Sequence, residues 1–201
     1  MREKILEKAT DMFLKLGFKS VTMDDLAQEL GISKKTIYTH FRNKTRLVEV
    51  STDRLFKIIS GGIDHICSLQ KNPIDEIYDI KKFAMAHLKN GKSSPQHQLK
   101  KYYPKIFGTL REKQFDIMQT CVVRNVRNGI EQNLYRDDLN VDFITRIYFS
   151  GMLSIQDREL FPDETFDMQE LEDHYLEYHL RGIVTPTGRK ILNGIINSNH
   201  E

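Results

Sequence analysis

The chain has 201 residues, of which 39% are hydrophobic and 29% are charged, and its formal net charge is +2. A chain of this length can bury a hydrophobic core without metals or disulfides, and this composition excludes wholesale disorder. No apolar run is long enough to span a bilayer, and the charged first residues lack the apolar core of a signal peptide. We therefore expect a soluble, cytoplasmic, globular protein.

Few residues have the spacing of a catalytic or metal site. Cys67 and Cys121 lie far apart and form no CxxC pair, so we expect reduced, buried thiols rather than a disulfide framework or a zinc site. Glu170 and His174 are one helical turn apart but have no further ligand at metal spacing. No HExxH, GxGxxG, GxSxG or P-loop segment occurs. The sequence therefore predicts a non-enzymatic protein with no catalytic residues, no metal site and no cofactor.

Apolar residues recur at intervals of three and four throughout the chain, which predicts an all-α fold of about nine to ten helices. We expect the first helix to end near Leu16, with Gly17 as a left-handed cap. Thr22 and Ser33 are expected to cap a second and a third short helix, because their hydroxyls can accept hydrogen bonds from free backbone N–H groups.

Longer helices are expected in the rest of the chain, the first of them capped by Asn43 or Thr45. The stretch 91–98, GKSSPQHQ, is expected to be a loop, and Pro104 to break the segment that follows. The expected helices cover about residues 44–69, 72–90, 110–132, 141–160 and 166–180, with a short last helix from about 185.

Charged side chains are distributed unevenly along the sequence. The cationic segment, residues 33–46, contains five lysines and arginines and no carboxylate. The acidic segment, residues 156–177, contains nine carboxylates against the single Arg158. The sequence therefore predicts one cationic end and one anionic end of the molecule.

The segment 22–41, TMDDLAQELGISKKTIYTHF, has the pattern of two short helices packed around a tight turn. Ala27 allows the helices to approach closely, and Gly31 suits the turn. A short basic helix on such a scaffold fits the major groove of DNA. We therefore expect a three-helix helix-turn-helix DNA-binding domain over residues 1–46, followed by a larger helical domain over residues 47–201.

The side chains that this third helix presents are basic or hydroxylic. Lys34 and Lys35 can donate to guanine, and Thr36 can hydrogen-bond a base or contact a thymine methyl. Other members are better placed for the phosphate backbone. The alternative is a positive helix face that is merely solvated. The expected DNA-contact set is Thr22, Lys34, Lys35, Thr36, Tyr38, Thr39, His40 and Lys44.

Over residues 5–50 the chain resembles the TetR-type (tetracycline-repressor-like) family of bacterial transcription regulators. The resemblance implies an Ω-shaped homodimer of all-helical subunits, a small-molecule pocket in the larger domain and an operator with two half-sites. Lys35 stands where the family often has a small residue. The most diagnostic positions are Gly31-Ile32-Ser33, Thr36-Ile37-Tyr38, His40-Phe41, Lys44 and Leu47.

The resemblance also assigns roles within the DNA-contact set. By position, phosphate contacts are implied at Thr22, Tyr38 and Lys44. Base contacts are implied at Lys34, Lys35, Thr36 and Thr39.

One DNA-binding domain contacts too few bases for useful specificity, so we expect a dimer whose recognition helices lie about one DNA turn (~34 Å) apart. Apolar residues of the helices expected at 141–160 and 166–180 are candidates for this interface, in the manner of a four-helix bundle. The same residues can instead complete the core of one chain. The candidates are Ile144, Ile147, Tyr148, Gly151, Met152, Ile155, Leu171, Tyr175 and Tyr178.

Aromatic and methionine residues gather in the middle of the sequence and are candidates for a ligand pocket, with His87, Tyr103 and Gln119 as the polar groups that orient the ligand. Such residues at helical spacing are also common in ordinary cores. The candidate pocket residues are Phe83, His87, Tyr103, Phe107, Phe115, Met118 and Gln119.

These features predict a ligand-responsive, sequence-specific DNA-binding transcriptional regulator, most simply a repressor that acts as a homodimer on a palindromic operator. An unidentified small-molecule effector would favour a conformation with wrongly spaced DNA-binding domains, and the long helix from about Lys44 would act as the lever. The alternative is a non-enzymatic adaptor or activator that binds a protein partner through the acidic segment.

Overall fold

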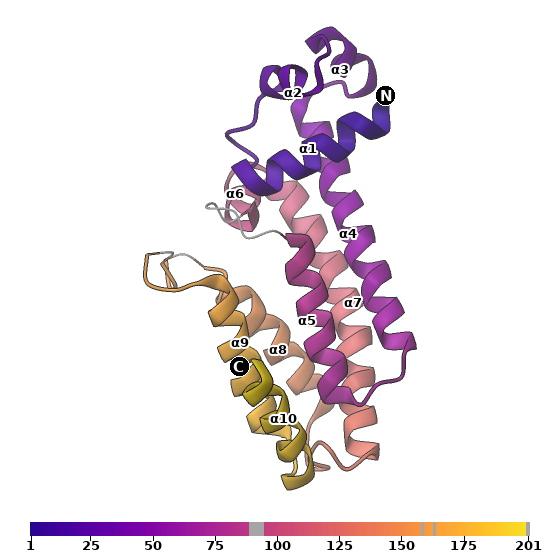
Figure 1. Ribbon diagram of the computed structural model, residues 1–201, viewed down its shortest axis with the longest axis vertical. Helices are drawn as coiled ribbons and strands as arrows, with labels where there is room; N and C mark the ends of the chain where they lie inside the picture. The colour runs from indigo at the N-terminus through magenta and orange to yellow at the C-terminus, as the bar shows by residue number, and fades with distance from the viewer. Residues whose placement is uncertain (89–94, 158, 163, 200–201) are drawn as a thin grey trace. The chain divides into compact units, whose positions relative to one another are not determined.

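A computed structural model describes residues 1–88, 95–157, 159–162 and 164–199, and these residues form ten α-helices (Figure 1). The predicted all-α fold class is confirmed for this part of the chain. No helix in it is long and apolar enough to cross a membrane. The helices are α1 (Arg2–Leu16), α2 (Met23–Leu30), α3 (Lys34–His40), α4 (Lys44–Ser68), α5 (Pro73–Leu88), α6 (Pro95–Tyr102), α7 (Pro104–Glu131), α8 (Val141–Ser154), α9 (Met168–Ile183) and α10 (Pro186–Asn199).

The chain divides into two compact units, each built from two stretches of sequence. The first unit contains residues 1–60 and 85–114, and the second contains residues 61–84 and 115–201. Helices α4 and α7 therefore contribute residues to both units. The sequence analysis expected one domain boundary, between residues 46 and 47. In the structure, α6 and the start of α7 belong to the same unit as α1–α3, so each unit combines two separate stretches of the chain.

The core of the first unit lies between α1, α2, α3 and the start of α4. Apolar side chains from each helix meet there, and Leu99 of α6 joins them although it is distant in sequence. Burial of these apolar side chains stabilises helices that are too short to be stable alone. The buried residues are Ile5, Leu6, Ala9, Met12, Phe13, Phe18, Val21, Met23, Leu26, Ala27, Ile37, Phe41, Leu47, Val48 and Leu99.

Side-chain caps fix where α2 and α3 begin. The Thr22 hydroxyl accepts a hydrogen bond from the backbone N–H of Asp25 at 3.1 Å, and the Asp25 carboxylate accepts one from the Thr22 N–H at 2.8 Å. The Ser33 hydroxyl accepts from the N–H of Thr36 at 3.0 Å. Both predicted caps are confirmed, and each satisfies N–H groups that the helix cannot.

Residues close in sequence also determine where α1 and α2 end and where α4 begins. Asn43 caps α4, because its side-chain oxygen accepts from the N–H of Arg46 at 2.8 Å. Gly31 ends α2 in the left-handed conformation, with φ 63° and ψ 32°. Helix α1 ends at Leu16 as expected, but Gly17 has φ 91° and ψ 151°, so the prediction of a left-handed helical cap there is wrong.

The loop expected over residues 91–98 is wrong from Pro95 onward, because α6 begins there. Residues 91–94 lie outside the described residues. A proline suits the first position of a helix, where no N–H is needed for an intrahelical bond. Helix α7 likewise begins at Pro104, six residues earlier than expected. Proline starts a helix in both places, and the expected break at Pro104 is confirmed, because α6 ends at Tyr102.

The C-terminal helices differ from the prediction at their ends. Helix α8 ends at Ser154 rather than near Leu160, and Leu160 is 65% exposed, so its apolar spacing reflects no buried face. Helix α9 begins after Asp167, whose carboxylate accepts from two following N–H groups. Helix α10 has 14 residues and is longer than the short helix expected.

The second unit has its own core, which encloses a polar network. The Asn125 amide donates to the Glu76 carboxylate at 2.8 Å and to the Pro73 carbonyl at 2.9 Å, and its oxygen accepts from the Tyr135 hydroxyl at 3.1 Å. Because buried polar groups need partners, this network fixes α5 against α7. The buried apolar residues are Ile74, Ile77, Val122, Val126, Leu134, Tyr135, Tyr148, Leu176, Leu180, Ile183, Val184 and Leu192.

Candidate DNA-binding surface

Helix α3 is anchored by one side chain and presents the others to solvent. Ile37 is fully buried in the first core, beneath the helix. Helices α1, α2 and α3 pack on one another (Figure 1), and Ile37 belongs to the core that they share. This arrangement displays a polar helix face on a small, tightly packed scaffold, which is the geometry that a helix entering a DNA groove requires.

Most of the predicted DNA-contact set is exposed. Thr36 and Lys44 are half-buried. Six side chains are exposed on α3 and at the start of α2, so they lie on the surface of one compact three-helix group. The exposed members are Thr22, Lys34, Lys35, Tyr38, Thr39 and His40.

Lys34 is engaged by a carboxylate of the preceding helix. Its Nζ atom lies 2.8 Å from Oδ2 of Asp24 on α2. This hydrogen bond to Asp24 raises the pKa of the Lys34 ammonium, so the side chain remains a cation. The sequence analysis did not expect this contact between Asp24 and Lys34, which are ten residues apart. A carboxylate beside an expected DNA-binding lysine opposes contact with phosphates by charge repulsion.

The hydroxyl groups of α3 form short contacts within the helix. The Thr36 hydroxyl lies 2.8 Å from that of Ser33, and the Thr39 hydroxyl donates to the Thr36 carbonyl at 2.7 Å. Each hydroxyl oxygen keeps free lone pairs for a further donor. The two threonines are therefore held in defined orientations before any ligand arrives, which limits the entropy lost on binding.

Lys44 has a structural contact besides its expected role at phosphates. Its Nζ atom donates to the Lys19 carbonyl at 3.0 Å and joins the start of α4 to the segment between α1 and α2. Partial burial lowers the pKa of Lys44, and the nearby charge of Asp25 opposes that shift. Because the Lys44 ammonium is half-buried and already donates one hydrogen bond, only its remaining N–H groups can contact a DNA phosphate.

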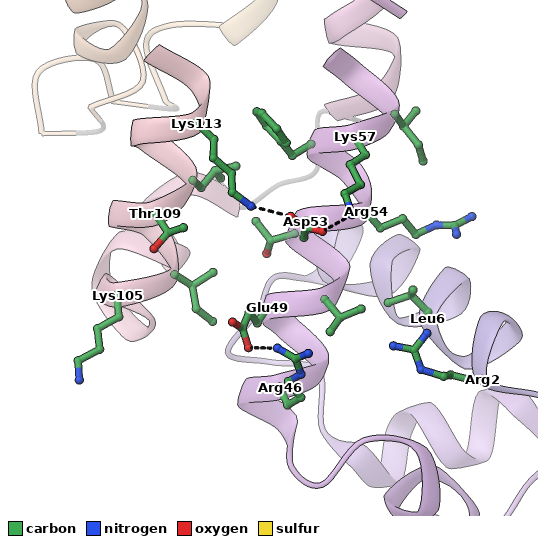
Figure 2. Close-up of a pocket in the computed structure, with 16 residues that line it drawn as sticks. Arg2, Leu6, Arg46, Glu49, Asp53, Arg54, Lys57, Lys105, Thr109 and Lys113 are labelled. Atoms are coloured by element: carbon green, nitrogen blue, oxygen red, sulfur yellow. Dashed lines mark hydrogen bonds and ion pairs between the residues drawn. The ribbon is translucent and has the colours of Figure 1, made fainter. Parts of the chain in front are cut away.

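A groove of about 870 Å³ lies between α4 and the start of α7, with α1 at its end (Figure 2). Its lining includes apolar side chains of α1, α4 and α7. None of the seven predicted pocket residues lines it. Its cationic lining residues are Arg2, Arg46, Arg54, Lys57, Lys105 and Lys113.

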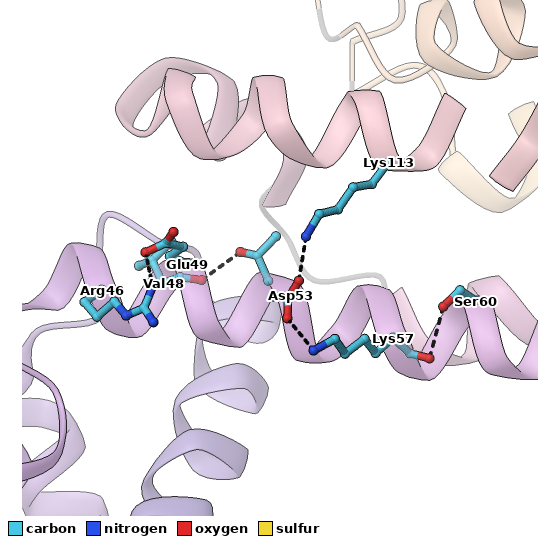
Figure 3. A network of polar contacts seen from close by, with 8 residues as sticks. Arg46, Val48, Glu49, Asp53, Lys57, Ser60 and Lys113 are labelled. Atoms are coloured by element: carbon cyan, nitrogen blue, oxygen red, sulfur yellow. Dashed lines mark hydrogen bonds and ion pairs between the residues drawn. The ribbon is translucent and has the colours of Figure 1, made fainter. Parts of the chain in front are cut away.

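Ion pairs neutralise much of this charge (Figure 3). Asp53 accepts hydrogen bonds from Lys57 at 3.0 Å and Lys113 at 2.7 Å, and Arg46 pairs with Glu49 at 2.7 Å. The Lys113 and Lys57 ammonium groups lower the pKa of the Asp53 carboxyl. The network joins α4 to α7 within the first unit, so ion pairs among the lining residues hold the two sides of the groove together. Sequence reasoning missed it because Asp53 and Lys113 are far apart along the chain.

The predicted pocket residues divide between the two units. In the first unit Tyr103 and Phe107 pack against the core of α1–α3, and the Tyr103 ring lies 6.5 Å from that of Phe18. His87, also in this unit, is half-buried. The structure therefore places Tyr103 and Phe107 as core residues, which the sequence analysis left open as an alternative.

The other four predicted pocket residues belong to the second unit. Phe115 packs edge-on against Phe149 with ring centroids 5.2 Å apart, and Met118 packs against the second core. Phe83 lies directly over Gly62, where a Cβ atom would come within 2.0 Å of its ring. Gln119 is half-buried. These four side chains lie on α5 and α7 and remain candidates for a ligand contact.

The predicted interface residues are of two kinds. Tyr148, Ile155 and Leu171 are buried within the chain, so they contribute to its own core rather than being exposed as expected. Tyr178 is 78% exposed, and Ile147 is exposed as well. The half-buried members are Ile144, Gly151, Met152 and Tyr175.

The sequence analysis missed one exposed apolar side chain on the same surface. Phe143 of α8 is 60% exposed and lies one helical turn before Ile147. Their spacing of four residues is the signal that would have found it. Tyr175 links α9 to α8, since its hydroxyl lies 3.0 Å from both the Ile147 and the Tyr148 carbonyl oxygens and shares its one hydrogen between them.

Comparison with known proteins gives the same family for the DNA-binding region. The family model described as "Bacterial regulatory proteins, tetR family" matches residues 5–50. The chain is 23% identical over 197 residues to the HTH-type transcriptional repressor KstR2 of Mycolicibacterium smegmatis, covering 94% of this chain and 93% of that protein. It is 30% identical over 80 residues to the Staphylococcus aureus biofilm operon negative regulator IcaR, covering 40% and 43% respectively.

Solved structures share the whole fold. A transcriptional regulator from Saccharomonospora viridis, solved in complex with choline, superposes with a TM-score of 0.73 at 18% identity, covering 92% of this chain and 97% of that one. The resemblance carried by residues 5–50 is thereby confirmed by the family model, and the ten-helix arrangement by the structural likeness. Residues 5–50 therefore match the TetR family of bacterial regulatory proteins, and the chain as a whole is similar to transcriptional regulators of this type.

Proposed function

We propose that this protein is a cytoplasmic, ligand-responsive repressor that binds a palindromic operator as a homodimer. The observation that carries the proposal is the construction of α3, in which Ile37 is buried while Lys34, Lys35 and Thr39 are exposed. The relatives named above as a repressor and a negative regulator favour repression over activation.

Within α3 we assign base contacts and phosphate contacts to different residues. Lys34, Lys35, Thr36 and Thr39 read base edges, because they lie on the first turns of the exposed helix, whose N-terminal end approaches the bases. The residues that hold the phosphate backbone and set the register of the helix in the groove are Thr22, Tyr38, His40 and Lys44.

We place the dimer interface on the exposed apolar face of α8 and α9. Phe143, Ile147 and Tyr178 there expose large apolar area that the chain itself leaves uncovered. A second copy that packs the same face against it removes this area from water and forms a four-helix interface. The half-buried Ile144 and Met152 complete the patch.

We place the effector in the second unit, near Phe83, Phe115, Met118 and Gln119. The choline complex of the Saccharomonospora viridis regulator supports a small-molecule ligand for this fold, although it does not define the chemistry of this one. The effector shifts the population between two conformations, with α4 as the connecting lever. A coupling of about 1 to 3 kcal/mol changes operator occupancy by about one to two orders of magnitude.

The test is selection of duplexes from a random-sequence pool, followed by fluorescence anisotropy titration of the selected duplex and a scrambled one over a range of salt. We expect a selective complex whose affinity falls steeply with salt. Lys35→Ala should abolish most of the selectivity. The matched control Lys190→Ala removes one exposed cation from α10 in the second unit and should leave selectivity unchanged.

Equal affinity for the selected and scrambled duplexes would overturn the proposal. Binding of neither duplex would favour the adaptor alternative, in which the acidic segment contacts a protein partner.

A further inference from the structure

The two cysteines of the chain, distant in sequence, face each other in the second unit. Cys67 lies at the end of α4 and Cys121 lies in α7. Their sulfur atoms are 3.3 Å apart. Both are free thiols in the structure, and Cys67 is buried whereas Cys121 is half-buried. The fold has therefore placed the only two thiols of the protein in direct contact.

A cation adjoins this pair. Arg124 follows Cys121 by about one turn of α7, and although burial lowers the pKa of its guanidinium, the nearby Cys67 and Cys121 sulfurs raise it. A cation beside a sulfur is the setting in which cysteines react as thiolates. Burial and the neighbouring Cys67 raise the pKa of the Cys121 thiol. The pair thus lies near a cation, and the Cys121 sulfur retains its proton.

We propose that Cys67 and Cys121 are an oxidation site that forms a reversible intrachain disulfide on exposure to a hydroperoxide. The Cys67 sulfur gives up its proton and attacks one peroxide oxygen, the O–O bond breaks, and the leaving oxygen takes a proton and departs as water or an alcohol. The Cys121 sulfur then attacks the resulting sulfenic sulfur, the S–O bond breaks, and the Cys121 proton leaves with the hydroxyl as water. Two thiols are oxidised and one peroxide is reduced.

The geometry suits this bond. A disulfide has a sulfur–sulfur distance of about 2.0 Å, so the two atoms need to approach by only about 1.3 Å. The pair also excludes a competing partner, because no other cysteine exists in the chain. The crosslink closes a loop between residues 67 and 121 and fixes the end of α4 to α7. Since α4 also supplies Leu47 and Val48 to the core of α1–α3, oxidation restrains the helix that the DNA-binding domain shares with the second unit.

The test uses the reduced full-length protein, treated with hydrogen peroxide and followed by maleimide labelling and intact mass. We expect labelled thiols to fall from two to none, the mass to fall by two hydrogens, and a monomeric band to persist on a non-reducing gel. Peptide mapping should find residues 67 and 121 in one crosslinked peptide. Dithiothreitol should restore both thiols. Because the closed loop is long, the melting temperature of the oxidised protein should rise by several degrees.

Three variants make the result specific. Cys67→Ser and Cys121→Ser should each show no intrachain crosslink and no peroxide-dependent rise in melting temperature. Arg124→Gln should form the same disulfide several-fold more slowly, which a purely structural role for Arg124 would not produce. Thiols that stay labelled at peroxide doses that oxidise methionines, or that reach only sulfinic acid or interchain crosslinks, would overturn the proposal. None of these measurements depends on DNA binding.

Discussion

The Lys34 ammonium lies 2.8 Å from the Asp24 carboxylate. One of the two adjacent lysines of the proposed DNA-reading helix α3 is therefore paired with a side chain of α2. Both side chains are exposed, and such ion pairs are easily exchanged for other partners. DNA phosphates and guanine acceptors compete for the same ammonium group. Asp24 therefore acts as an intramolecular competitor that lowers affinity.

Asp24→Asn is expected to raise affinity for DNA by about threefold or more, because it frees Lys34 and removes a negative charge near phosphates. The gain should shrink as salt is raised. Anisotropy titration with operator and scrambled duplexes measures it. Glu29→Gln is the matched control, since Glu29 is also on α2 but pairs with Lys8 of α1. An unchanged or weaker affinity for Asp24→Asn would contradict competition by Asp24.

Lys44→Ala and Thr36→Val are expected to separate positioning from reading. Loss of the Lys44 cation should weaken binding to all duplexes alike and reduce the slope of log affinity against log salt by about 1 per chain. Thr36→Val keeps the shape of the side chain but removes the hydroxyl, so it should change the preferred bases and leave the salt slope intact. Selection and salt titration of both variants test this. If both variants change selectivity to the same degree, the assignment of separate roles is wrong.

Leu99→Ala is expected to destabilise the DNA-binding domain, although residue 99 lies far from it in sequence. Leu99 is 2% exposed and completes the core of α1–α3. Truncation of a buried leucine costs about 2 to 5 kcal/mol. Urea unfolding measures the loss, and Leu69→Ala at an exposed leucine is the control. A loss similar to that of the control would show that α6 does not contribute to this core.

Ile147→Glu is expected to convert the proposed dimer to a monomer. A carboxylate in the centre of an apolar interface is desolvated without a partner, which opposes association strongly. Sedimentation velocity measures the oligomeric state, and Leu160→Glu places the same charge at an exposed leucine outside α8 and α9. A dimer that survives Ile147→Glu would exclude this face as the interface.

The features that sequence reasoning found are those that depend on near neighbours. Thr22, Ser33 and Asn43 cap helices through residues three positions on, so their effect is visible in a short window. Ile37 follows from helical periodicity, and the exposed lysines beside it follow from the same rule. The family resemblance likewise rests on one continuous stretch of 46 residues, from residue 5 to residue 50.

The features that it missed are contacts between residues far apart. A polar stretch with a proline, such as PQHQ, reads as a loop until Leu99 is known to be buried against α1–α3. The spacing of Cys67 and Cys121 gave no sign that their sulfurs meet, because only the packing of α4 on α7 decides it. The burial of Tyr148 and Ile155 depends in the same way on the packing of α8. Periodicity identifies an apolar face but not what covers it.

Two buried groups of α9 should make stability depend on pH in opposite directions. Burial raises the pKa of Glu172 to about 7, against an ordinary value of 4.5, and lowers that of His179 to about 4, against 6.5. Between about pH 4.5 and 7 the folded protein keeps a proton on Glu172 that the unfolded chain has released, so its contribution to stability is lost as pH rises. Between about pH 6.5 and 4 the unfolded chain binds a proton at His179 but the folded protein does not. The contribution of neutral His179 to stability is therefore lost as pH falls.

Replacing one of the two residues should therefore reveal how the other makes the free energy of unfolding depend on pH. Each shift corresponds to about 3 kcal/mol across its window, and in the wild type the two largely cancel between about pH 4.5 and 6.5. Glu172→Gln should leave a free energy of unfolding that rises with pH, and should stabilise the protein above pH 7, where the wild type buries a charge. His179→Gln should leave one that falls as pH rises from 4.5 to 7. Urea unfolding at half-unit pH intervals measures both, and parallel curves for the two variants would show that neither group titrates as its burial requires.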